Sequence, residues 1–168
     1  MELTTAFARR RGFEIIDENY WTIPPEVLEE TGVEIKLPKR ATQQSAAYDF
    51  FALNDAVILP GQSVYFPTHI KAYMQPGEVL LMYPRSSQGI KLSLMLSNTT
   101  GVVDADYYSN PENDGHIGIY LRNVGSTAAI IKAGDRIAQG MFTEYLMVDG
   151  EEYVELPKRV GGTGSTGR

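Results

Sequence analysis

The stretch Ala56–Pro67 (AVILPGQSVYFP) carries the pattern that decides the fold. Two short runs of valine, isoleucine and aromatic residues are separated by Pro60-Gly61, and the second run ends at Pro67. Runs of this kind, bounded by glycine and proline, are typical of β-strands joined by tight turns. The stretch therefore predicts two consecutive strands.

Runs of the same kind recur along most of the chain. They cover residues 12–16, 33–37, 48–53, 78–83, 92–96, 117–121, 128–131, 137–145 and 153–156. Many short strands at this spacing predict an all-β sandwich or barrel. In the first third of the chain only Pro24–Glu30 predicts a helix, because a proline pair opens it and Gly32 can end it.

The composition indicates one soluble globular domain. The chain has 168 residues, a net charge of −6, no cysteine and two histidines, His69 and His116. The absence of cysteine excludes disulfides and thiolate metal sites, and the negative charge argues against a surface that binds nucleic acid. There is no run of about 18 apolar residues and no secretory signal pattern, so we expect a cytoplasmic protein that does not enter a membrane.

The two ends of the chain differ from its middle. Residues 161–168 (GGTGSTGR) are too rich in glycine to bury a core, and we expect them to be flexible when nothing is bound. We therefore divide the single domain 1–168 into an N-terminal extension with the short helix (1–33), a β core (34–158) and a mobile C-terminal lid (159–168).

Gly101–Tyr107 (GVVDADY) is the first candidate for chemistry. In an extended strand Asp104 and Asp106 point to the same side. Like charges this close need a partner, a water or a metal between them. The alternative is an ordinary turn capped by aspartates.

Two other segments carry groups suited to phosphate. Arg85, Ser86 and Ser87 follow an apolar run and offer a planar guanidinium and two hydroxyls. The glycine-rich tail, preceded by Arg159, would let backbone amides approach a phosphate closely. Each has a plainer alternative, a turn with a surface arginine in the first case and a flexible terminus in the second.

Gly134–Gln139 (GDRIAQ) forms a tight turn that enters an apolar run. We expect Asp135 and Arg136 to pair and hold the turn. Gln139 is a candidate for binding, because an amide within an apolar strand needs partners if it is buried.

Together these segments form a recognisable set. Five segments in order, 46–49 (AAYD), 84–87 (PRSS), 101–107, 134–139 and 161–167, resemble the five motifs of the trimeric deoxyuridine triphosphatases (dUTPases). The resemblance runs from about Ile35 to the C-terminus, and the N-terminal portion is similar to that of members from Gram-positive bacteria and their phages. It implies a distorted jelly-roll or β-clip barrel with one short N-terminal helix and a flexible glycine-rich tail.

The resemblance implies hydrolysis of dUTP to dUMP and pyrophosphate, which would limit uracil in DNA and supply dUMP for thymidylate synthesis. Asp104 would be the general base for the water that attacks the α-phosphorus, with Arg85 and Ser86 as the other catalytic groups. Tyr107 would lie against the deoxyribose and exclude a 2′-hydroxyl. The remaining substrate-binding residues would be Ser87, Asn98, Gly101, Val102, Val103, Gly118, Gln139, Arg159, Gly162, Thr163, Gly164, Ser165 and Thr166.

The resemblance also implies a cofactor and an assembly. Mg²⁺ would be held mainly by the triphosphate, with Asp49 meeting it through water. The protein would be a homotrimer in which each active site draws motifs from all three subunits, so a monomer would be inactive.

Some positions depart from the family pattern. Thr163 stands where family tails usually carry phenylalanine over the uracil, and the segment after Tyr107 is longer than usual. One hypothesis is that Tyr108 or His116 partly replaces the missing ring. The alternative is that both lie in a solvated loop.

Two other functions fit parts of the sequence. The dCTP deaminases share this fold and some have a similar Arg-Ser-Ser loop, but Tyr120 stands at about the position of their catalytic glutamate, and they lack such a tail. A non-catalytic trimeric binding or regulatory module is the other reading, with Asn110–Asp114 as a surface for a regulatory protein. The intact Asp104 and the tail favour catalysis.

Overall fold

The protein is described here by a computed structural model covering residues 9–151, 155–157, 159 and 161. Its helices are α1 (Pro25–Thr31) and α2 (Ser86–Leu92), with the 3₁₀ turns η1 (Glu18–Tyr20) and η2 (Ala105–Tyr107). The strands are β1 (Gly12–Ile15), β2 (Tyr48–Phe51), β3 (Ala56–Ile58), β4 (Ser63–Phe66), β5 (Ile70–Tyr73), β6 (Glu78–Tyr83), β7 (Leu94–Leu96), β8 (Gly101–Asp104), β9 (Ile119–Asn123), β10 (Ala129–Ile131) and β11 (Arg136–Glu144). The lid from Gly162 onward lies outside the described residues, as does part of the predicted strand at 153–156.

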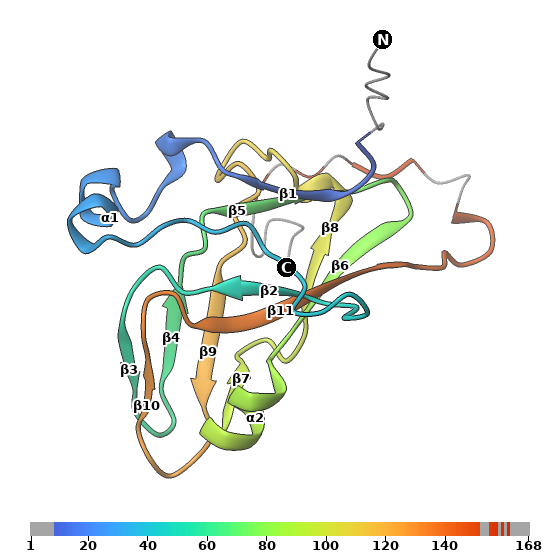
Figure 1. The fold of residues 1–168 in the computed structure, drawn as a ribbon. Helices are drawn as coiled ribbons and strands as arrows, with labels where there is room; N and C mark the ends of the chain where they lie inside the picture. Colours follow the sequence, from blue (N-terminus) through green and yellow to red (C-terminus); the bar gives the residue numbers. More distant parts are fainter. Residues whose placement is uncertain (1–8, 152–154, 158, 160, 162–168) are drawn as a thin grey trace.

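The strands form four small antiparallel sheets (Figure 1). Their orders are β1-β5, β3-β10, β4-β9-β7 and β2-β11-β6-β8. The all-β prediction is confirmed, but the described strands do not close into a barrel, because no continuous ladder of pairs links the four sheets. No described helix is long and apolar enough to cross a membrane.

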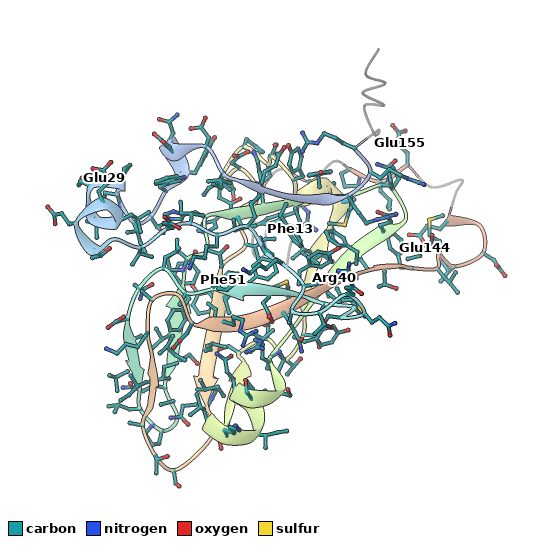
Figure 2. The ribbon with its side chains drawn as sticks, viewed as in Figure 1. Phe13, Glu29, Arg40, Phe51, Glu144 and Glu155 are labelled. Atoms are coloured by element: carbon teal, nitrogen blue, oxygen red, sulfur yellow. The ribbon has the colours of Figure 1, made fainter. Side chains whose placement is uncertain are left out.

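One hydrophobic core lies between the sheets. Along β9 the side chains of Ile119, Leu121 and Asn123 are buried and those between them are exposed, as expected for a strand with one face inward. The ring of Phe13 in β1, which is labelled in Figure 2, packs edge-on against Phe50 of β2 and lies 5.3 Å from the ring of Phe142 in β11. The N-terminal strand therefore belongs to the core.

The local predictions differ in outcome. The helix predicted at Pro24–Glu30 is present as α1, and Gly32 ends it with φ +66°. A second helix, α2, is formed by Ser86–Leu92 beyond the first third of the chain. The strand predicted at 33–37 is absent, since this segment pairs with no described strand. Apolar and polar residues alternate here because one side of the segment is half-buried, and a segment can be half-buried without pairing with another strand.

Candidate active site

A cavity of about 590 Å³ opens beside β8. It is lined by Tyr65, Met82, Leu96, Ser97, Asn98, Gly101, Val102, Val103, Asp104, Tyr107, Asn113, His116, Ile117, Gly118, Ile119, Tyr120 and Arg159. Asn98 and the predicted binding residues within Gly101–Tyr107 therefore share one cavity with Gly118 and Arg159.

β8 supplies the cavity with backbone groups that pair with no described strand. It is the outer strand of the four-stranded sheet and pairs only with β6 among the described strands. An edge strand keeps unpaired amide and carbonyl groups on its free side. Val102 is 60% exposed there, so the β8 backbone is accessible to a planar ligand with both donors and acceptors.

Asp104 and Asp106 are held by one cation. The Arg159 guanidinium contacts Asp104 through its terminal nitrogen, and its Nε donates to Asp106 Oδ1 at 3.0 Å. The same guanidinium lies 5.9 Å from the centre of the Tyr107 ring. The arginine that precedes the glycine-rich tail thus pairs with both neighbouring carboxylates and offsets part of their charge.

Tyr107 is fixed by two hydrogen bonds. Its hydroxyl donates to the carbonyl of His116 at 2.9 Å and accepts from Asn113 Nδ2 at 2.8 Å. The ring is therefore a rigid wall beside Asp104.

Tyr108 and His116 already have structural partners. His116 is buried, and its Nε2 accepts from the amides of Thr68 and His69 at 3.2 and 3.0 Å. Tyr108 donates to the Glu14 carboxylate. Both side chains are committed to the scaffold, which does not favour the hypothesis that either replaces the missing lid ring.

The predicted phosphate groups form a second cluster around Asp49. Asp49 is buried and accepts from Arg85 Nε at 2.7 Å and from Arg136 Nη1 at 3.3 Å. Gln139 donates to the carbonyl of Pro84 at 3.1 Å, which holds the loop before α2. Ser86, in the first turn of α2, is exposed.

The expected pair between Asp135 and Arg136 does not form. Arg136 turns to Asp49, and Asp135 instead accepts from the amide of Lys132 at 2.8 Å. Asp135 therefore holds the turn through the backbone, because a buried carboxylate across the sheet is the better partner for the guanidinium.

The two clusters lie at opposite edges of the four-stranded sheet. Asp104 pairs with Val79 of β6, whereas Tyr83 pairs with Gln139, which pairs with Asp49. From Val79 to Tyr83 the backbone advances about 13 Å, and the three strand spacings from β8 to β2 add about 14 Å across the sheet. Within one chain, the Asp49 cluster is therefore far from Asp104.

Comparisons with known proteins agree with this geometry. A dUTPase family model matches residues 33–167. The deoxyuridine 5'-triphosphate nucleotidohydrolase of Lactococcus lactis subsp. lactis (strain IL1403) is 43% identical over 157 residues, which cover 94% of this chain and 97% of that protein. The chain belongs to the dUTPase family.

Solved dUTPase structures share the fold. The dUTPase of Streptococcus mutans is 40% identical, with a TM-score of 0.68 over 83% of this chain and 99% of that one. A mutant of the dUTPase from phage phi11 of S. aureus is 19% identical, with a TM-score of 0.62 over 83% and 93% of the two chains. A structural Mg(II) ion is described for this mutant.

In this dUTPase the described residues do not form a metal centre of their own. No group of three or more histidine, cysteine, aspartate or glutamate side chains is arranged to hold an ion within the described part of the chain. Both carboxylate oxygens of Asp49 are engaged by arginines. A divalent cation would therefore need the phosphates of a nucleotide for most of its ligands.

Sequence reasoning missed several members of the site, and Arg136 and Tyr65 are two of them. Arg136 joins the Asp49 cluster, and Tyr65 lines the cavity from β4. Neither is signalled locally, because Arg136 follows a turn residue and Tyr65 lies in an ordinary apolar run. Their roles depend on which strands become neighbours.

Proposed function

We propose that this chain hydrolyses dUTP to dUMP and pyrophosphate. The observation that carries the proposal is the cavity in which Asp104, the rigid Tyr107 and the open edge of β8 lie together in a member of the dUTPase family. The base would lie between β8 and Gly118 and bind their backbone groups, with Asn98 at the far end of β8. Tyr107 would lie against the deoxyribose.

Asp104 would act as the general base. Its side chain is 45% exposed, so a water can reach it, but one oxygen contacts Arg159. The phosphates of a bound nucleotide would draw Arg159 away from Asp104, because they carry more negative charge than the carboxylate pair. The freed oxygen could then accept a proton from the water that attacks the α-phosphorus, a step worth about 100-fold to 10,000-fold in rate.

The phosphates would bind to Arg85, Ser86, Ser87 and Gln139 of a different subunit. Within one chain these groups are at the opposite sheet edge from Asp104, farther than a triphosphate can span. A symmetric homotrimer brings such separated surfaces together at each interface. Bound Mg²⁺, held mainly by the triphosphate, would neutralise phosphate charge, and Asp49 would position Arg85 and meet the ion through water.

The proposal also includes the division of the domain and the metabolic role expected from the sequence. The single domain would consist of the extension at 1–33, the core at 34–158 and a lid at 159–168 that closes over the nucleotide. The reaction would limit uracil in DNA and supply dUMP.

The test compares two neighbouring aspartates. Asp104→Asn is expected to lower kcat for dUTP at least about 100-fold while nucleotide affinity changes only a few-fold. Asp106→Asn is the matched control, because it also removes a carboxylate from Arg159 but leaves the base, and its kcat should stay within about fivefold of wild type.

Product analysis with Mg²⁺ gives the readout. Pyrophosphate from dUTP supports the proposal, whereas ammonia released from dCTP would support a deaminase. Equal losses in the two variants would assign the effect to Arg159 placement and contradict the role of Asp104 as a base.

A further inference from the structure

Tyr65 lies directly against the backbone of Gly118. A Cβ added to Gly118 would be 2.2 Å from Tyr65 Cε2 and 2.6 Å from the Tyr65 hydroxyl oxygen. Gly118 has no positive φ that would itself demand glycine, so close approach of the ring is the reason for glycine here. The edge of the phenol therefore forms the cavity wall at the point where Gly118 exposes its backbone.

The Tyr65 side chain points away from the core. Its neighbour Phe66 is fully buried, so Tyr65 is on the other face of β4. Tyr65 pairs across the strands with Tyr120, and their rings are 4.8 Å apart. The two rings give this end of the cavity an aromatic wall.

Among the described residues, three tyrosines line the cavity, and their hydroxyl groups differ in hydrogen bonding. The Tyr107 hydroxyl already donates to His116 and accepts from Asn113. Tyr120 is 55% exposed, so water can satisfy its hydroxyl. The Tyr65 hydroxyl has no hydrogen-bond partner among the described residues, and it sits in a half-buried ring whose pKa burial raises to about 12. It is therefore a neutral donor at the cavity wall.

We propose that Tyr65 is a base-binding residue whose hydroxyl donates to a carbonyl oxygen of the pyrimidine bound between β8 and Gly118. The inference rests on the proposed function and adds a side-chain contact to the backbone contacts described there. A uracil ring offers two carbonyl oxygens, and a half-buried phenol with no protein partner at the cavity wall is well placed to satisfy one. The ring of Tyr65 also limits how far the base can enter.

The test removes one oxygen atom. Tyr65→Phe keeps the ring against Gly118, so its fold is expected to be unchanged. The Kd for dUMP, measured by titration calorimetry on the full chain, should rise about threefold to tenfold, and the KM for dUTP should rise similarly with kcat within about twofold. Tyr145→Phe is the matched control, because Tyr145 is exposed and outside the cavity.

The outcomes separate this inference from the proposed function. Unchanged dUMP affinity in Tyr65→Phe overturns the inference, and so does an equal loss in Tyr145→Phe or a fall confined to kcat. If the wild type hydrolyses dUTP and Tyr65→Phe binds dUMP with wild-type affinity, the proposed function is supported. Only the role of Tyr65 is then refuted. Wild-type protein that neither binds dUMP nor hydrolyses dUTP would overturn both.

Discussion

At the scale of single residues, Gly118 is a glycine because of the ring beside it. The Tyr65 phenol occupies the volume that a Cβ would need. Tyr65 lies in β4 and Gly118 directly precedes β9, so their contact is tertiary. A double-mutant cycle can therefore measure it.

Gly118→Ala is expected to destabilise the protein by about 1 to 3 kcal/mol, since the new methyl group would force the Tyr65 ring or the backbone to move. Tyr65→Val should cost less in the Gly118→Ala background than in the wild type, because the smaller valine relieves the clash with the new methyl group. The wild type, the two single variants and the double variant are unfolded with denaturant at the same protein concentration. The coupling free energy between the two residues is expected to be about 1 kcal/mol or more. Additive losses would mean that the two residues do not contact each other.

Asp49 shows the same dependence on neighbours. From the sequence it was expected to meet a metal through water, and the structure gives it two arginines. A buried carboxylate needs such partners, so Asp49 fixes the direction of Arg85 before any ligand is present.

At the scale of elements, two histidines attach the N-terminal segment to the core. Nε2 of His69 accepts from the amides of Thr22 and Ile23 at 3.2 and 3.4 Å, and the Trp21 ring stacks on the imidazole at 5.0 Å. His116 accepts from the amide of His69 itself. Each bond requires a neutral imidazole, because a protonated ring has no acceptor.

Stability should therefore fall with mild acid. Burial lowers the pKa of both histidines to about 4, from about 6.5 when unfolded. Between these values the unfolded chain binds protons that the folded chain does not, so the stabilisation is complete above about pH 6.5 and is lost as the pH falls toward 4. We expect a loss of about 1 to 2 kcal/mol per histidine between pH 7 and pH 5, measured by denaturant unfolding.

A double variant supplies the control. In His69→Gln/His116→Gln the amide oxygens can accept the same bonds but do not titrate, so the fall between pH 7 and pH 5 should largely vanish. The carboxylates with a lowered pKa, such as Glu14, Glu78 and Asp114, lose their stabilisation only below about pH 4.5. An unchanged slope in the double variant would assign the acid sensitivity to other groups.

At the scale of the whole molecule, the two halves of the proposed site face different ways. The base and sugar region lies beside β8, and the phosphate groups lie across the sheet beside β2. In the proposed trimer, one chain would carry half of each of two sites, which gives a direct test of assembly.

Two inactive variants should restore activity when mixed. Asp104→Asn and Arg85→Gln would each abolish turnover alone, but co-refolded trimers contain sites that take Asp104 from one subunit and Arg85 from another. With equal amounts and random assembly, about one quarter of the sites are intact, so about one quarter of wild-type activity is expected. Variants refolded separately and then combined are the control, and no recovery after co-refolding would place both groups in one subunit.

The sequence by itself determined the short strands, helix α1 and the motif set with its family. These are local properties, because glycine, proline and β-branched residues act on their own backbone and motifs are read along the chain. Only the tertiary structure decided that Arg136 turns to Asp49, that Tyr65 rests on Gly118, and that Arg159 holds Asp104 and Asp106. Each of these contacts joins residues distant in sequence, so it depends on which strands pair and in which register.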